Sequence, residues 1–302
     1  MYLSTRFYTY FSKNLLMGGV CVGVSEEGNQ SGMSSWPWQL FMLSLLVASP
    51  CQGLAPSPPS PCATLADSLN AAASNFNVFE TELEGRVERT VRTARAARAG
   101  DTLFRVPRAR LLSSARDGVR STPLGRVAAT LPGTIEADFL ACWLITVDAG
   151  ACWEGSVERL FLDTLPRDFS HVPDFWRPAD FKRLLRGTYM ERVIEARQAA
   201  EGVRFEGLKA AAAAAAPSLP ADVLAGLSPE AFKWAHGIVR SRGFHGPDDE
   251  ETPSMTMIPL VDMINHNDEP TCCYDYSESG DFVVTARNDM EAGAELLLRY
   301  GR

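Results

Sequence analysis

The amino-acid sequence predicts an α+β protein in which a helical middle is followed by a β-rich C-terminal third. Apolar residues recur at helical spacing in residues 135–165 and again in residues 181–205. Two β-rich runs, 273–276 and 282–286, are joined by a polar turn, and a last apolar run covers residues 295–300. Helices and strands that are separated along a chain are typical of the α+β class.

Length and composition exclude several classes of protein. The chain has 302 residues, a net charge of −8 and a hydrophobic fraction of 46%, which suits one large or two modest globular domains. Its seven cysteines show no regular spacing and no Cys-x-x-Cys. This pattern argues against a disulfide scaffold and against a zinc site, so we expect no metal.

The first 75 residues differ from the rest. Residues 1–25 contain two basic residues and no acid, a bias seen in organelle transit peptides. The nine-residue apolar run 40–48 is shorter than the about 20 residues that span a bilayer, but it suits a secretory signal peptide. Four prolines in residues 56–61 indicate an extended linker. We therefore predict that residues 1–75 form a plastid or secretory targeting leader, or a disordered linker of a cytoplasmic protein, without a stable membrane span.

Residues 84–98 predict a helix with a basic stripe, because five arginines recur there at a period of three among alanines. Such a stripe could bind nucleic acid, but no aromatic residues are interleaved with it. We therefore expect a solvated face and no nucleic-acid partner. Residues 102–106, which end at Pro107, predict a short strand.

A second helix is predicted to begin at Ser228-Pro229-Glu230, which supplies an N-cap, a proline at the first helical position and an acid in the first turn. We expect it to end near Gly243 in a left-handed conformation. His236 on this helix is expected to be a satisfied core or surface histidine.

Residues 257–267 have the most unusual composition in the chain. The apolar run 257–261 leads into Asp262, Asn265 and His266. A buried carboxylate, amide or imidazole costs roughly several kcal/mol unless it has a partner. We expect these side chains to bind a ligand or to brace neighbouring segments.

Common catalytic motifs are absent from the sequence. It contains no Gly-x-Ser-x-Gly elbow, no phosphate-binding loop, no Gly-x-Gly-x-x-Gly and no His-Glu-x-x-His. Asp262 and His266 could form two arms of a hydrolytic triad, but no Ser or Cys nucleophile lies on a recognisable elbow.

Residues 262–267, with Ile-Pro-Leu at 258–260 and Arg-Ser-Arg-Gly-Phe at 240–244, resemble the SET-domain protein methyltransferases. The closest class is the one that contains the Rubisco large-subunit lysine methyltransferase and the actin-histidine methyltransferase. Residues 100–107, 161–166 and 291–301 agree with this family in order and spacing. The resemblance covers roughly residues 76–302.

The resemblance implies a β-rich SET domain with small sheets and a knot-like C-terminal strand, split by a helical insert. Its N-terminal part would be residues 76–127, the insert 128–230 and its C-terminal part 231–302.

The resemblance also implies a monomeric enzyme that transfers a methyl group from S-adenosylmethionine to a protein substrate, to lysine rather than to histidine. Tyr300 would be the catalytic residue. The residues implied to bind the cofactor are Glu84, Ser241, Arg242, Asp262, Asn265 and His266.

Two departures from the family leave an alternative open. Alignment backward from Pro107 puts Thr90 where the family's early cofactor loop carries a second glycine. Either three residues are inserted or the loop is altered, and a β-carbon at that position would hinder the cofactor. The chain also ends two residues after Tyr300, which we interpret as a truncated gene model. The alternative is a catalytically impaired SET-like protein that serves as an interaction module.

Overall fold

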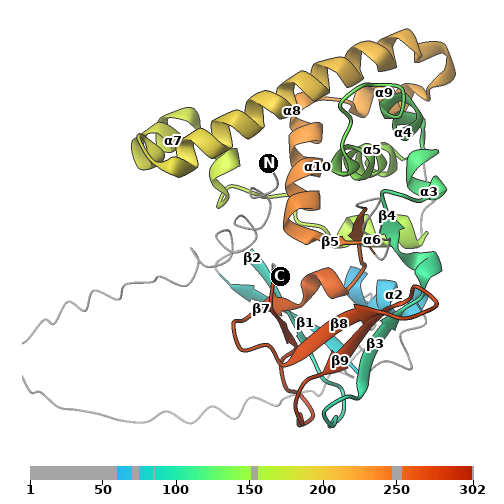
Figure 1. Cartoon of the computed structure of the whole chain (residues 1–302), viewed down its shortest axis with the longest axis vertical. Helices are drawn as coiled ribbons and strands as arrows, with labels where there is room; N and C mark the ends of the chain where they lie inside the picture. The colour runs from blue at the N-terminus through green and yellow to red at the C-terminus, as the bar shows by residue number, and fades with distance from the viewer. Residues whose placement is uncertain (1–59, 70–74, 84–85, 151–155, 247–253, 301–302) are drawn as a thin grey trace, which may run out of the picture.

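The computed structural model describes residues 60–69, 75–83, 86–150, 156–246 and 254–300. Helices gather in one part of the molecule and short strands in the other (Figure 1). The predicted α+β class is confirmed. Most of the predicted leader lies outside the described residues.

One piece of the predicted leader is folded. Helix α2 (Pro61–Ser68) begins at Ser60, whose side chain accepts a hydrogen bond from the Ala63 N–H. Its Cys62 and Leu65 are buried, and the helix packs against α6 (Val157–Thr164). A capped helix with a buried apolar face replaces the expected disorder there, so the prediction is wrong for this stretch.

A three-stranded antiparallel sheet is the largest of the small sheets, in the order β3-β9-β8. It contains β3 (Thr102–Val106), β8 (Cys272–Tyr276) and β9 (Phe282–Ala286), which confirms the three strands predicted there. Along β9, buried residues alternate with partly exposed ones, because one face of the sheet covers the core.

Two further sheets are very short. One has the order β4-β6-β5 and consists of β4 (Leu112–Ser113), β5 (Gly243–His245) and β6 (Met255–Met257). The other pairs β7 (Asn265–His266) in parallel with β10 (Leu297–Leu298). The final strand is therefore shorter than the predicted residues 295–300.

The predicted basic helix at residues 84–98 is wrong. The chain there forms β2 (Arg86–Arg92), which pairs antiparallel with β1 (Asn77–Leu83). The opposite edge of β2 also has a partner, because the Leu296 N–H donates to the Val91 carbonyl at 2.7 Å. Pairing on both edges outweighs the local helical preference, and one of these partners lies about 200 residues away in the sequence, beyond the reach of local patterns.

The helical part surrounds α5 (Glu136–Asp148), in which every residue from Asp138 to Val147 is buried. It packs against α4 (Pro123–Ala128), α6 and α10 (Pro229–Arg242), and the long α8 (Tyr189–Ala214) lies on the outer side (Figure 1). No helix in the described ranges has the length and apolar character needed to cross a membrane. The other helices are α3 (Asp117–Arg120), α4 (Pro123–Ala128), α7 (Pro178–Leu185), α9 (Ala221–Gly226) and α10 (Pro229–Arg242), with 3-10 turns η2 (Arg108–Arg110), η3 (Pro173–Phe175), η4 (Ala216–Ser218) and η5 (Val261–Met263).

Helix α10 begins as predicted but ends differently. Ser228 caps it by accepting from the Ala231 N–H. Gly243 has φ −79° and ψ 141°, an extended rather than left-handed conformation. The reason is that Gly243 enters β5 directly and pairs with Met257, so the helix leads without a turn into the strand beside the site.

We predict that Phe282→Ala lowers the free energy of unfolding by about 3–5 kcal/mol. Phe282 is 0% exposed, and its ring lies 4.9 to 5.4 Å from those of Phe244, Tyr274 and Tyr276. The control is Phe79→Ala, because Phe79 is 46% exposed and its removal should cost less than about 1 kcal/mol. Urea denaturation measures the free energy of unfolding of both variants. Equal losses of stability would contradict this description of the core.

Candidate active site

The candidate site is built where the C-terminal residues cross the Asn265–His266 segment. Parallel pairing of β10 with β7 sets Leu297 beside Asn265 and Leu298 beside His266. The Asn267 N–H extends the pairing by donating to the Leu298 carbonyl at 3.0 Å. Two segments more than 30 residues apart in the sequence therefore meet, and Tyr300 follows directly.

The His266 ring holds the backbone of Tyr300. The Tyr300 N–H lies 3.0 Å from His266 Nδ1, and the two rings are 5.1 Å apart. A backbone N–H can only donate, so Nδ1 must be the acceptor, although the Leu298 oxygen also lies 3.2 Å from it. The proton of the neutral ring then sits on Nε2, which is 3.6 Å from a carboxylate oxygen of Asp268.

The hydroxyl of Tyr300 donates to the carbonyl oxygen of Ile264. Burial raises the pKa of this phenol well above its usual range, while Arg242 lowers it and Asp262 raises it by smaller amounts. Tyr300 is therefore a neutral phenol at physiological pH.

The amide of Asn265 is fixed by two acceptors. Its Nδ2 donates to the Arg89 carbonyl at 3.2 Å and to Glu295 Oε1 at 3.1 Å, which uses both of its N–H groups. The amide oxygen makes no hydrogen bond to any described residue. Asn265 therefore presents a fixed, open acceptor.

Asp262 and Arg242 form an ion pair of 2.6 Å at the same site. The side chain of Asp262 is 0% exposed and that of Arg242 is 19% exposed. The second carboxylate oxygen, Oδ1, is buried and has no hydrogen-bond partner among the described residues. One oxygen of Asp262 is thus neutralised, and the other is a buried acceptor that lacks a hydrogen-bond donor among the described residues.

A strained turn sets Asp262 in place. Leu260 has φ +71°, the left-handed region that side chains with a β-carbon rarely occupy. It is almost completely buried and is followed directly by the turn η5, which contains Asp262. Strain of about 1–3 kcal/mol is tolerated only where the surrounding packing over-determines the conformation.

Among the described residues, Ser241 is the predicted site residue with no hydrogen bond to this cluster. Ser241 directs its hydroxyl back to its own helix and donates to the carbonyls of Gly237 and Ile238. Glu84 lies outside the described residues. The structure brings together Arg242, Asp262, Asn265, His266 and Tyr300, while their roles stay predictions.

Arg89 and Glu295, which hold the Asn265 amide, were missed at the sequence level. Arg89 was assigned to the solvated face of a helix, but its guanidinium pairs with Glu80 at 2.7 Å and donates to the Thr164 carbonyl. The overlooked signal is the alternation of residues 87, 91 and 93, all β-branched, with polar neighbours.

The predicted place of Thr90 is also wrong. Thr90 lies in β2 opposite Phe79, and not in a loop. The inferred obstacle to a cofactor at this position therefore disappears.

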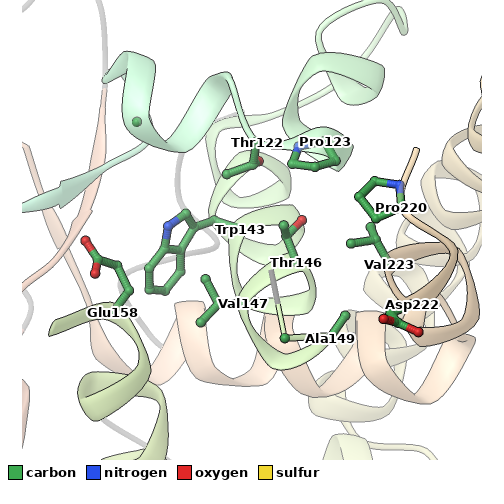
Figure 2. Close-up of a pocket in the computed structure, with 12 residues that line it drawn as sticks. Thr122, Pro123, Trp143, Thr146, Val147, Ala149, Glu158, Pro220, Asp222 and Val223 are labelled. Carbon is green, nitrogen blue, oxygen red and sulfur yellow. The ribbon is translucent and has the colours of Figure 1, made fainter. Parts of the chain in front are cut away.

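A separate hollow of about 440 Å³ lies within the helical part (Figure 2). Trp143, Thr146 and Val147 of α5 line it together with Val223 of α9. No predicted site residue lines this hollow, so it does not belong to the candidate active site.

Comparison with known families identifies the fold. The family model of the SET domain matches residues 88–301. The chain belongs to the SET-domain family. Comparison with curated protein sequences gives no significant match.

Solved SET-domain structures share this fold. The SET domain of LSMT bound to lysine and AdoHcy superimposes with a TM-score of 0.60 at 16% identity, covering 80% of this chain and 53% of that one. Rubisco LSMT bound to sinefungin and monomethyllysine superimposes with a TM-score of 0.60 at 19% identity, covering 82% of this chain and 53% of that one. Rubisco LSMT bound to AdoMet superimposes with a TM-score of 0.58 at 18% identity, covering 80% of this chain and 53% of that one. This SET-domain chain spans about half the length of these structures.

We predict that Arg242→Met lowers the free energy of unfolding by about 3–5 kcal/mol, because it leaves the Asp262 carboxylate buried and unpaired. Arg242→Met combined with Asp262→Leu should recover most of that loss, since no charge then stays buried. Denaturant titration of both variants checks this. The control is Arg105→Met, which breaks a 3.1 Å surface pair with Asp281 and should cost about 0–1 kcal/mol. A double variant no more stable than Arg242→Met would contradict the assignment.

Proposed function

We propose that this protein is an S-adenosylmethionine-dependent protein methyltransferase that acts on lysine side chains. The observation that carries the proposal is the junction of Tyr300 with the Asn265–His266 segment inside a SET domain. It unites an amide oxygen and a buried carboxylate oxygen, both without a donor among the described residues, and a neutral phenol in one cluster.

The residues present fit the proposed cofactor. S-adenosylmethionine carries an adenine amine and an ammonium group, which are donors that need acceptors. Asn265 Oδ1 and the buried Asp262 Oδ1 are acceptors at the site that have no donor among the described residues. Asn265 with Arg242 and Asp262 would hold the cofactor. When bound, it would supply a sulfonium methyl to a neutral amine as the S–C bond breaks and the N–C bond forms, leaving a neutral thioether.

Tyr300 would orient the reacting groups rather than remove a proton. Its raised pKa keeps the phenol protonated, so it is not a base at neutral pH. Its backbone and hydroxyl are both held by the 264–266 segment, which fixes the direction of the ring. Holding two reactants in near-attack geometry is the main source of rate for such a transfer.

A substrate lysine must be neutral before it can accept a methyl group. With a reference pKa near 10.4, deprotonation costs about 4–5 kcal/mol at pH 7. Burial beside a sulfonium and Arg242 lowers the pKa of the amine and offsets much of that cost.

Lysine is proposed over histidine because of the structural neighbours. Rubisco LSMT was solved with lysine and with monomethyllysine, and the fold matches over about 80% of this chain. The impaired-enzyme alternative loses one of its two arguments, since Thr90 lies in β2.

We predict that Asn265→Ala weakens binding of S-adenosylmethionine by at least about tenfold, the equivalent of one good hydrogen bond to the ligand. Isothermal titration calorimetry measures the dissociation constant. Asn267→Ala is the matched control, because Asn267 is exposed and its side chain only caps the nearby Glu269 N–H. Undetectable binding to the folded wild-type protein would refute the proposed function.

We predict that Tyr300→Phe lowers the rate of methyl transfer to protein by about 10²-fold or more, while cofactor affinity changes little. Incubation of a lysate with the purified chain and isotope-labelled S-adenosylmethionine measures the transfer, and mass spectrometry identifies the modified side chain. Labelling of histidine would overturn the lysine assignment alone, whereas an unchanged rate would remove Tyr300 from the mechanism.

A further inference from the structure

The last turn of α10 is held by charged groups on two opposite sides. Arg242 reaches Asp262 at the candidate site. Arg240, two residues earlier, cannot face the same way on a helix. It turns toward the helical part, where it pairs with Glu201 of α8 and lies 3.7 Å from Asp174 of η3.

Asp174 is the buried centre of this contact. Its carboxylate pairs with Arg197 of α8, whose Nε lies 3.1 Å away, as well as with Arg240 of α10. Its backbone carbonyl accepts from Gln198 at 3.0 Å. Asp174 therefore joins two helices through one side chain that is 1% exposed.

The neighbouring residue, Phe175, docks η3 on the same helix. A β-carbon at Gly237 would lie 2.8 Å from Phe175 Cζ, so the ring rests directly on the helix backbone. Phe175 also stacks on Phe169 at 4.9 Å, which fixes its position from the other side. Two adjacent residues of η3 thus contact α10 one turn apart.

A row of balanced charges along α8 pairs this helix with η3, α5 and α10. On α8 the residues 197, 201 and 204 follow helical spacing, and each forms an ion pair with a residue of another element. A buried ion pair stabilises little in total, but it specifies one register, because any slip leaves a charge unpaired. The acids are Asp138, Asp174 and Glu201, and the bases are Arg197, Arg204 and Arg240, with His236 beside Asp138.

We propose that Asp174 and Arg240 are positioning residues for the active site. The ion pairs of Arg240 with Asp174 and with Glu201 fix the last turn of α10, and this turn carries Arg242 to Asp262 and leads into β5. The inference rests on the proposed function, since the site that it positions is the one assigned to the cofactor.

The test compares two arginines that bind the same carboxylate. Arg240 and Arg197 are 15% and 18% exposed, and both pair with Asp174, but only Arg240 lies on α10. We expect Arg240→Gln to weaken S-adenosylmethionine binding by at least about fivefold and Arg197→Gln by less than about twofold. Calorimetry is carried out below the melting temperature of each variant.

A double-mutant cycle separates positioning from a general loss of stability. If Arg240 acts through the Arg242–Asp262 pair, Arg240→Gln should have little further effect on affinity in an Asp262→Asn background. Arg240→Lys should recover part of the affinity. Gly237→Ala is a second variant that raises helix propensity but pushes Phe175 away, and it should weaken binding as well.

The outcomes distinguish the two proposals. Absence of binding to the wild-type protein refutes the proposed function. The positioning role alone is overturned if the wild-type protein binds S-adenosylmethionine but Arg240→Gln and Arg197→Gln lose equal affinity. Fully additive losses of affinity in the double-mutant cycle would overturn it as well.

Discussion

The parallel contact between β7 and β10 is the constraint on which the rest of the site depends. Only two residues on each strand pair, so the contact is too short to be stable alone. The His266 ring, the hydroxyl of Tyr300 and the amide of Asn265 each add a hydrogen bond across it. Asn265, which would hold the cofactor, and Tyr300, which would orient the reaction, therefore also hold the C-terminal segment in place.

The helical part contributes to the site through α10. This helix is buried against α5, passes the row of ion pairs on α8 and ends at Arg242 without a flexible turn before β5. On the other side of Arg242, the left-handed Leu260 directs Asp262 inward. The desolvation penalty of a buried ion pair exceeds its Coulombic attraction unless the geometry of the pair is fixed. Both sides of the Arg242–Asp262 pair therefore need a rigid support.

Sequence patterns predicted the elements whose signals are local. The cap at Ser228 marked α10, the proline after residue 106 marked β3, and the β-rich run 282–286 marked β9. The strand β2 was missed because the regular spacing of its arginines favoured a helix over the alternation at residues 87, 91 and 93, and because no local pattern reports its pairing with residues 294–296. The same error hid Arg89 and Glu295 as partners of Asn265. The resemblance named Tyr300, but the contact of His266 with its backbone emerges only in three dimensions.

The most direct test of the central claim is a crystal structure of this chain with S-adenosylhomocysteine, the thioether product of the proposed transfer. The account predicts that the ligand contacts Asn265 and lies beside Asp262 and Tyr300. A ligand bound elsewhere, or none at this site at saturating concentration, would contradict it.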